Sequence, residues 1–402
     1  MNAPSGGSLT RSAGPAPRKA GRTGRRLQAG LLALASLGIL AMGSAATASA
    51  ATASTHSRTA AAAAPSSPAK MVGLVDGRLL GATTAQLNAD LTQDASSGAT
   101  ALRDQLSWNA VEPTMGVYNW APFDALVNAV AAHNMSLLVL IDFTPPWARA
   151  TGCATWTCPP ANPSQFASFA AMAAARYGNK VAAWEIWNEP NSAAFWTPAA
   201  SPSAYSQLLN LTSAAIQAAD PGAYIVSGGL APEPDDGVDI DQVTFLSKVC
   251  SAGGLASASA IGDHPYSFPV LPDYPAVWNA WQQMNNTSPS LRSVMTSCGA
   301  ASKPIWITEY GAPTNGPGVA ATLSNYDLPA HPTHVDLNLQ ATMVTNAVSD
   351  VQADSWVGSL FFYSASDAGT AVTTNQNFFG LLNYDNTPKP AWSALQTALG
   401  AS

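Results

Sequence analysis

Residues 181–219 read VAAWEIWNEPNSAAFWTPAASPSAYSQLLNLTSAAIQAA, and this stretch contains the repeating unit of the chain. The apolar run 181–187 predicts a strand, and a loop follows it. The stretch 205–219 then has the apolar spacing of an amphipathic helix. Ser201-Pro202 and Asp220-Pro221 supply the boundaries expected around such a helix. The unit is therefore a strand, a loop and a helix.

This unit recurs from residue 71 to residue 399, and eight repeats predict an α/β fold, a single (β/α)₈ barrel. The strands are continuous apolar runs, which is typical of parallel strands covered on both faces. A doubly wound open sheet is the alternative, but Val75-Asp76-Gly77 lacks the Gly-rich first turn of that fold. The predicted strands are 71–75, 101–106, 137–143, 181–187, 223–227, 259–263, 304–308 and 357–363, and the predicted helices include 123–133, 165–177, 205–219, 243–250, 337–350 and 390–399.

The first 50 residues have the pattern of an export signal. They contain six basic and no acidic residues, then an apolar stretch over 27–42, and they end in Ala48-Ser49-Ala50. A basic start, an apolar core and an A-x-A site predict a secretory signal over 1–50. A membrane anchor is the alternative, but the run is shorter than the ~20 apolar residues of a span. We expect a secreted protein without stable membrane insertion, with an Ala/Ser/Pro-rich linker over 51–69 and one domain over 70–402.

Composition limits the class of partner. The chain of 402 residues is 47% hydrophobic and contains 12 Trp, 10 Tyr and 11 Phe, so it can bury a large core and is not disordered. Beyond residue 50, 11 basic residues face 24 acidic ones, a net charge of −13. Nucleic acid is therefore an unsuitable partner, because binding phosphates requires clustered Lys and Arg. A neutral or cationic ligand fits this charge, and the sequence gives no indication of oligomeric state.

Export also changes what the four cysteines predict. In an oxidising compartment they are expected to form disulfides, with three possible pairings. We favour Cys153–Cys158 with Cys250–Cys298, because the first two share one Pro-rich segment. A zinc site is the alternative, but the spacings include no CxxC pair and no His lies near any of the four. The sequence shows no ligand cluster of His and carboxylates either, and we expect no metal and no organic cofactor.

Two of the five glutamates in the chain end predicted strands beside aromatic residues. Glu189 ends the fourth strand, and Glu309 ends the seventh within Trp306-Ile307-Thr308-Glu309-Tyr310-Gly311. In a (β/α)₈ barrel the chemistry is carried by the loops that follow the strands. Two carboxyl groups facing each other there can cleave a glycosidic bond, one protonating the leaving oxygen and the other attacking or stabilising the sugar carbon. The alternative is that each glutamate only pairs with a buried Arg.

Asn188-Glu189-Pro190 after the fourth strand and Glu309 after the seventh resemble glycoside hydrolase clan A over about residues 71–399. The resemblance is closest to the family 39 and family 5 (cellulase-type) retaining glycosidases. It implies that Glu189 is the general acid/base and Glu309 the nucleophile of a double displacement. It also implies that Asn188 hydrogen-bonds the sugar 2-hydroxyl. Retention requires the two carboxyl groups to lie ~5 Å apart.

Arg103, near the end of the second strand, resembles the Arg that clan members place beneath the nucleophile. We expect it to hold Glu309 ionised, with Glu185 as a second partner. Glu185 shares strand parity with Glu189 and should point into the barrel, where it is a partner for a cation rather than a catalyst. The alternative for Arg103 is a bond to neighbouring backbone only.

Residues 262–266 read GDHPY and end the sixth predicted strand. His264 and Tyr266 match a His and a Tyr found at this place in the resembling families, where the Tyr contacts the nucleophile. A phenol that donates to Glu309 would lower the pKa of that carboxyl. The alternative for His264 is a hydrogen-bonded core histidine.

Aromatic residues in barrel loops are candidate platforms for sugar rings, and ordinary packing beneath the loops is the alternative. The eighth strand departs from the clan, because it lacks the Trp that commonly ends it and reads FFYSASD over 361–367. Tyr363 or Phe362 is the candidate replacement. The candidate platforms are Trp108, Trp147, Trp156 and Trp196, and Asn109 and Asp142 are candidate partners of sugar hydroxyls.

The sequence therefore predicts a secreted retaining glycoside hydrolase that acts on an oligo- or polysaccharide. Glucan, xylan and mannan all fit an acidic, Trp-rich cleft. A carbohydrate-binding barrel that has lost catalysis is the alternative, motivated by the altered eighth strand. An acyl hydrolase is disfavoured because the chain has no G-x-S-x-G elbow.

Overall fold

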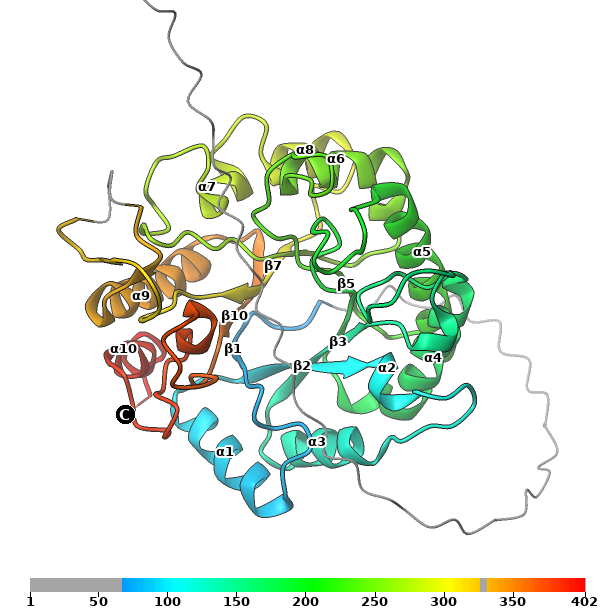
Figure 1. The fold of residues 1–402 in the computed structure, drawn as a ribbon, viewed down its shortest axis with the longest axis horizontal. Coiled ribbons are helices and arrows are strands. Elements are labelled where there is room, and N and C mark those ends of the chain that lie inside the picture. The colour runs from blue at the N-terminus through cyan, green and yellow to red at the C-terminus, as the bar shows by residue number, and fades with distance from the viewer. Residues whose placement is uncertain (1–66, 326–330, 402) are drawn as a thin grey trace, which may run out of the picture.

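The computed structural model describes residues 67–325 and 331–401. In this part of the chain eight parallel strands form one sheet in the order β5-β4-β3-β2-β1-β10-β7-β6, and the helices lie outside it (Figure 1). The predicted leader over 1–50 and residues 51–66 of the predicted linker lie outside the described residues. The strands are β1 Met71–Val75, β2 Ala101–Ser107, β3 Ser136–Asp142, β4 Ala183–Ile186, β5 Ile225–Ser227, β6 Ile261–Asp263, β7 Ile305–Tyr310 and β10 Val357–Tyr363.

The sheet closes between its two end strands, β5 and β6. Val226 bridges Ala260 and Leu230 bridges Asp263, both in parallel orientation, and the Ser227 amide donates to the Ala260 carbonyl at 3.1 Å. The single (β/α)₈ barrel is therefore confirmed, and the doubly wound open sheet is excluded. A further pair of two-residue strands, β8 Ala320–Ala321 and β9 His334–Val335, lies between β7 and the next helix.

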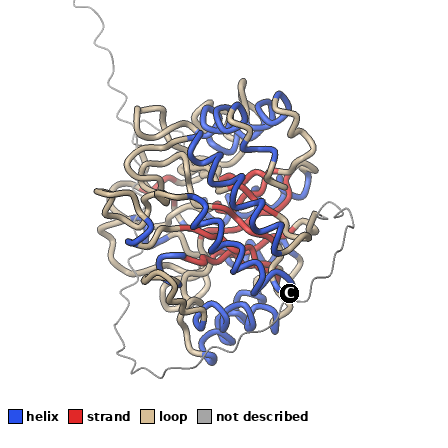
Figure 2. Tube along the Cα trace, turned by 90° about the vertical axis from the view of Figure 1, so that its right-hand side faces the viewer, coloured by secondary structure: helices blue, strands red, loops and turns tan. Residues whose placement is uncertain are grey.

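The helices surround the strands on the outside, as Figure 2 shows in blue around red. Those that the sequence predicted are all present and begin at the predicted residue or up to three residues before it. In α5 Pro202 occupies the first turn, and in α9 the Asp336 side chain accepts from the Leu339 amide. No helix of the described residues has the length and apolarity that crossing a membrane requires. The helices are α1 Thr84–Ser96, α2 Trp108–Val111, α3 Ala121–Ala132, α4 Pro163–Tyr177, α5 Pro202–Ala219, α6 Gln242–Ser251, α7 Ala280–Asn285, α8 Leu291–Ser297, α9 Leu337–Ala353 and α10 Pro390–Leu399.

Two hydrophobic clusters hold the barrel together. The larger one lies between the strands and the helices, and a smaller one fills the barrel interior. Because side chains fill the interior, the polar residues of the site lie above a packed floor rather than along a pore. The interior cluster consists of Met71, Ala101, Leu138, Ala183, Tyr224, Val226, Ala260, Trp306 and Phe361.

The two predicted disulfides are confirmed. Cys153 pairs with Cys158 within the segment that follows β3, and Cys250 at the end of α6 pairs with Cys298 after α8. The first bridge closes a sequence separation of 5 and the second one of 48. The second therefore restricts the unfolded chain far more than the first.

This difference predicts unequal effects on stability. Replacing Cys250 and Cys298 by alanine is expected to lower the free energy of unfolding by about 4 kcal/mol, because the closed loop is long. The matched Cys153→Ala/Cys158→Ala variant should lose about 2 kcal/mol. Denaturant unfolding of both variants measures the difference. A larger loss for the short loop would contradict the argument from chain entropy.

Candidate active site

Polar side chains from several strands meet at the carboxyl end of the barrel. Arg103 comes from β2, Glu309 from β7, and His264 directly follows β6. Asn188 and Glu189 follow β4 after one intervening residue. The eight-stranded closure thus brings together residues that lie as much as 206 positions apart in the sequence.

The backbone after β4 bends sharply to present these side chains. Trp187 has a φ of +71° and Glu189 a φ of +43°, both in the left-handed region. This conformation is uncommon for residues other than glycine and is concentrated at functional sites. The bend ends β4 at Ile186, one residue before the predicted end. Trp187 fills the space behind the bend, since its ring is fully buried and its Nε1 donates to the Phe195 carbonyl at 2.8 Å.

A β-bulge in β7 directs Glu309 into the site. The pairing of β7 with β10 moves from Ile307–Leu360 to Tyr310–Phe362, so three steps along β7 match two along β10. An extra residue of this kind re-aims a side chain, and bulges are common beside active sites. Strict alternation would place Thr308 and Glu309 on opposite faces. Instead both contact residues of the barrel mouth.

The two glutamates lie face to face. One carboxylate oxygen of Glu189, one of Glu309 and a ring nitrogen of His264 all lie within 4.8 Å of one another. His264 Nδ1 is 2.9 Å from Glu189 Oε1 and 3.8 Å from Glu309 Oε2. Both carboxylates are almost fully enclosed by protein, with side-chain exposures of 11% and 12%. The separation matches the spacing of retaining glycosidases and is shorter than the ~6.5–9.5 Å of inverting ones.

Arg103 joins three acceptors beneath the pair. Its Nη1 donates to Glu309 Oε1 at 2.6 Å, its Nε to Glu185 Oε2 at 2.6 Å and its Nη2 to Asn188 Oδ1 at 2.9 Å. The expected partners of Arg103 are thus both present. Because the Asn188 oxygen accepts from Arg103, the NH₂ group is the part of this amide that can donate to another group.

Glu309 is held in its ionised form. Tyr266 OH donates to Glu309 Oε2 at 2.7 Å, so both oxygens of this carboxylate accept a hydrogen bond. Burial by itself would raise the pKa of Glu309, but the charges of His264 and Arg103 and the bonds from Tyr266 and Arg103 outweigh it. The pKa of Glu309 therefore lies below its usual value.

Glu189 has the opposite tendency. Burial raises the pKa of Glu189 above its usual value, and the nearby charge of Glu309 adds to this, while His264 and Arg103 offset only part of it. The pKa of His264 is also raised, because the charges of Glu309 and Glu189 and the bond to Glu189 exceed the effect of burial. Two carboxyl groups with pKa values pushed apart are the arrangement in which one acts as an acid and the other as a nucleophile.

Tyr363, at the end of β10, lies near both glutamates. Its pKa is raised first by burial and then by the negative charges of Glu309 and Glu189. Its ring contacts Phe379 with centroids 5.4 Å apart. Phe362 is fully buried and contacts Tyr310 on the opposite face of β10. Of the two candidates for the missing Trp, the structure therefore brings Tyr363 to the site and not Phe362.

Trp108 does not form a sugar platform. Its ring is fully buried in the outer core, and its Nε1 donates to Glu112 at 2.7 Å. Trp196 is also buried, against Trp187. The prediction for Trp108 and Trp196 is wrong, because the segments after β2 and β4 fold back and pack these rings against the helices.

The other predicted contacts lie at the periphery of the mouth or beneath it. Trp147 is partly exposed and donates to the Glu112 carbonyl at 3.0 Å. Trp156 is partly exposed and stacks on Phe143 at 5.3 Å. Asn109 accepts from Arg149 at 3.2 Å, and Asp142 is fully buried with a pKa raised by burial. Their roles toward a sugar stay predictions.

Thr308, Gly229 and Phe379 are site residues that sequence reasoning missed. Thr308 contacts His264 at 3.0 Å, and Phe379 packs against Tyr266 with centroids 5.9 Å apart. A Cβ on Gly229 would lie 2.1 Å from His264 Nε2, so only glycine fits there. Thr308 could have been found from its place in the strand-end motif, whereas nothing in the sequence marks the other two.

Glu189, His264 and Glu309 could geometrically contribute one ligand each to a metal ion. Their atoms are already engaged, however. Both Glu309 oxygens accept from Arg103 and Tyr266, and His264 Nδ1 is bonded to Glu189. A divalent cation would have to replace these bonds beside the guanidinium of Arg103. The donor set therefore fits a carboxyl pair better than a metal site, and the predicted lack of a metal stays a prediction.

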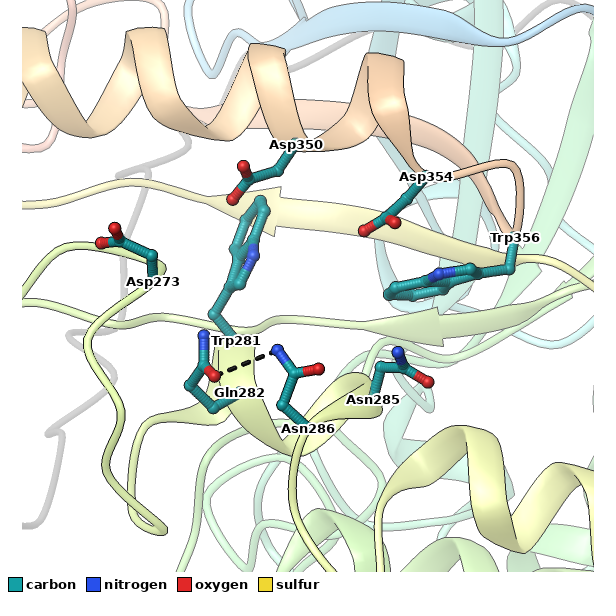
Figure 3. Close-up of a pocket in the computed structure, with 8 residues that line it drawn as sticks. All are labelled: Asp273, Trp281, Gln282, Asn285, Asn286, Asp350, Asp354 and Trp356. Atoms are coloured by element: carbon teal, nitrogen blue, oxygen red, sulfur yellow. Dashed lines mark hydrogen bonds between the residues drawn. The ribbon is translucent and has the colours of Figure 1, made fainter.

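A separate cavity of about 240 Å³ lies outside the barrel, and Figure 3 shows two tryptophans in it among carboxylates and amides. Asp354 and Trp356 precede β10, whose other end, Tyr363, lies at the mouth. Trp281, on another side of the cavity, packs against Tyr310 with ring centroids 4.8 Å apart. Its lining residues are Asp273, Trp281, Gln282, Asn285, Asn286, Asp350, Asp354 and Trp356.

Comparison with known proteins agrees with this geometry. Residues 117–399 match the family model of the glycosyl hydrolases family 39. No curated protein matches the chain. The family match spans the β4, β6 and β7 residues of the site.

Solved glycosidase structures share the fold. A family 39 glycoside hydrolase from Bacteroides cellulosilyticus WH2 superposes with a TM-score of 0.61 at 21% identity, covering 82% of this chain and 63% of that one. A monomeric β-xylosidase from Caulobacter crescentus CB15 superposes with a TM-score of 0.57 at 18% identity, covering 83% of this chain and 69% of that one. The GH5_18 protein from Streptomyces cattleya, solved with GlcNAc, superposes with a TM-score of 0.55 at 17% identity, covering 83% of this chain and 80% of that one. The chain thus spans less than two thirds of the length of the Bacteroides enzyme.

Proposed function

The chain belongs to glycosyl hydrolase family 39, and on this basis we propose that it is a secreted retaining glycosidase of oligo- or polysaccharides. The observation that carries the proposal is the spacing of Glu189 and Glu309, whose facing oxygens lie within 4.8 Å. This gap leaves room for a sugar carbon between nucleophile and acid, but not for the additional water that inversion requires.

In the first step a Glu309 oxygen bonds to the anomeric carbon while the bond to the leaving oxygen breaks. Glu189 gives its proton to that oxygen, so the leaving group departs neutral. In the second step Glu189 takes a proton from water, and the water oxygen displaces Glu309 from the sugar. Both steps invert the anomeric carbon, and the product retains the configuration of the substrate.

The surrounding residues support each step. Arg103 and Tyr266 hold Glu309 ionised and fixed before attack. The NH₂ group of Asn188, oriented by Arg103, is placed to bind the sugar 2-hydroxyl. Tyr363 supplies the floor beneath the sugar where relatives of the clan carry a Trp. No step requires a metal ion or an organic cofactor.

The pKa directions predict a bell-shaped pH dependence of kcat/KM. The rate should rise where Glu309 ionises, at a pH below the ~4.3 of an ordinary glutamate, because its pKa is lowered. It should fall where Glu189 loses its proton, at a pH above that value, because its pKa is raised. Initial rates across pH measure both limbs. If kcat/KM already falls on its basic side below pH ~4.3, the assignment of Glu189 as the acid is contradicted.

Secretion is the second part of the proposal. It is supported by the two disulfides and by the predicted leader over 1–50. Expression of the full chain in a secreting host, followed by sequencing of the N-terminus of the exported protein, tests it. We expect a start close to residue 51.

The experiment for the activity is a screen of aryl glycosides and neutral polysaccharides with the purified protein. β-Xylosides come first, since one structural neighbour is a β-xylosidase. We expect turnover of at least one glycoside, lost in Glu309→Gln. Affinity for a saccharide without any product would instead support a binding protein that has lost catalysis.

A further inference from the structure

Beneath the acid/base, a chain of buried hydrogen bonds leads away from the substrate side. Glu189 Oε1 lies 2.9 Å from His264 Nδ1, and His264 Nε2 lies 3.0 Å from Thr308 Oγ1. Thr308 Oγ1 in turn lies 2.8 Å from Glu185 Oε1. His264, Thr308 and Glu185 are completely buried, so water cannot replace any of these partners.

Counting protons along this chain fixes their positions. Glu185 receives the Arg103 Nε hydrogen on one oxygen and the Gly229 amide hydrogen on the other, so it acts as an acceptor throughout. Thr308 therefore donates its single hydroxyl hydrogen to Glu185. Its oxygen can then only accept from His264, and this requires a hydrogen on Nε2.

We propose, on the basis of the function proposed above, that Thr308 and Glu185 are positioning residues that keep the His264 proton on Nε2. His264 Nδ1 is then the ring nitrogen that bonds Glu189, and His264 Nδ1 and Glu189 Oε1 share one proton. That proton is the one which Glu189 delivers to the leaving group. Thr308 contacts no substrate and acts through His264.

Gly229 independently supports this arrangement. Its missing side chain makes the close approach possible, because a Cβ there would lie 2.1 Å from His264 Nε2 and 2.6 Å from Thr308 Oγ1. Its amide also donates to Glu185 Oε1 at 3.0 Å. The β5 end of the barrel is thus shaped around the contact between the His and the Thr.

The fixed tautomer determines when the acid loses its proton. With hydrogen on Nε2, loss of the shared proton leaves the Nδ1 lone pair facing the Glu189 carboxylate, which is repulsive. The proton is therefore retained to higher pH. The other groups that face His264 are Glu309, with Oε2 at 3.8 Å, the charge of Arg103, and the ring of Tyr266 at 6.3 Å between centroids. Glu309 lies beyond hydrogen-bond distance of Nδ1, and the guanidinium of Arg103 has no acceptor to offer either ring nitrogen.

Thr308→Val tests the proposal, with Thr308→Ser as the matched control that keeps the hydroxyl. Without an acceptor at Nε2, neutral His264 can carry its hydrogen on Nδ1 and donate to ionised Glu189. The basic limb of kcat/KM should then move to lower pH by about one unit, the effect of losing one hydrogen bond at a buried charged pair. The serine variant should keep the limb of the wild type. A valine variant that loses activity without any movement of the limb would overturn the proposal and leave Thr308 a purely structural role.

The tautomer itself is read by ¹⁵N NMR of histidine-labelled protein, with His264→Gln to assign the signal. At high pH we expect hydrogen on Nε2 in the wild type and in Thr308→Ser, and on Nδ1 in Thr308→Val. Hydrogen on Nδ1 in the wild type would overturn the proposal. This readout requires no turnover, so it separates a failure of the proton arrangement from a failure of the proposed glycosidase activity.

Discussion

Replacing Glu309 by alanine is expected to lower kcat by roughly 10⁴-fold or more, because it removes the atom that forms the covalent bond to the sugar. The loss should be the same for good and poor leaving groups, since both need the nucleophile. The fold should survive, because Arg103 keeps its ion pair with Glu185 at 2.6 Å. Initial rates on two aryl glycosides with different leaving groups, together with thermal unfolding, measure this.

An added nucleophile gives the sharper readout of the same variant. Azide fits the space left by the missing carboxylate and can attack the sugar once, so activity should partly return and the glycosyl azide should have inverted configuration. Glu112→Gln is the control, because Glu112 is a buried glutamate whose carboxylate accepts hydrogen bonds from Trp108 and from the Gly116 amide. It should keep nearly full activity. A similar loss of kcat in both variants would contradict the assignment of Glu309 as the nucleophile.

Replacing Glu189 by alanine is expected to have an effect that depends on the leaving group. Substrates with poor leaving groups should lose about 10²–10⁴-fold in kcat/KM, the usual contribution of general acid catalysis. Activated aryl glycosides should form the glycosyl-enzyme at nearly the wild-type rate, because their leaving groups need no proton. Comparing rates over a series of aryl glycosides measures this as a steeper dependence on leaving-group pKa.

For this variant azide acts at the second step and should give a glycosyl azide of retained configuration. The two variants thus produce opposite anomers from the same added nucleophile, and product NMR distinguishes them. Equal losses on good and poor leaving groups in Glu189→Ala would contradict the role of acid/base. The basic limb of the pH profile should also disappear, since the group that titrates there is gone.

The fold could be predicted because one short strand–loop–helix unit repeats along the chain. Each strand–loop–helix unit appears in the pattern of apolar residues, and eight such units have one common closed solution. The ends of strands were less predictable. β4 stops at Ile186 because Trp187 adopts a left-handed conformation, and this depends on the packing of its ring rather than on local propensity.

The site could be predicted where chemistry and strand position coincide. Glu189, Glu309, Arg103 and Tyr266 are charged or phenolic residues at strand ends, and the structure brings them into contact. Trp108 was predicted wrongly, because a Trp after a strand is equally suited to a sugar or to the core. Sequence position does not show which way the following loop folds.

Thr308 is a site residue whose role the sequence does not reveal. A threonine in a strand is common, and its role arises only from a β-bulge that places it beside His264 while Glu309 also faces the mouth. The bulge is a property of the register between β7 and β10, whose first paired residues, Ile305 and Val357, lie 52 positions apart in the sequence. The hydrogen-bond chain that controls the proton of Glu189 therefore becomes visible only in three dimensions.

The central claim is that Glu309 forms a covalent bond to the sugar while Glu189 lies within reach of the leaving oxygen. The measurement that tests it most directly is trapping with a 2-deoxy-2-fluoro glycoside that carries a good leaving group. The fluorine slows both steps, and the leaving group keeps the first one fast enough for the intermediate to accumulate. Mass spectrometry of the digested protein should find the sugar on the peptide that contains Glu309. A label on any other residue, or an unlabelled enzyme that releases product of inverted configuration, would contradict the account.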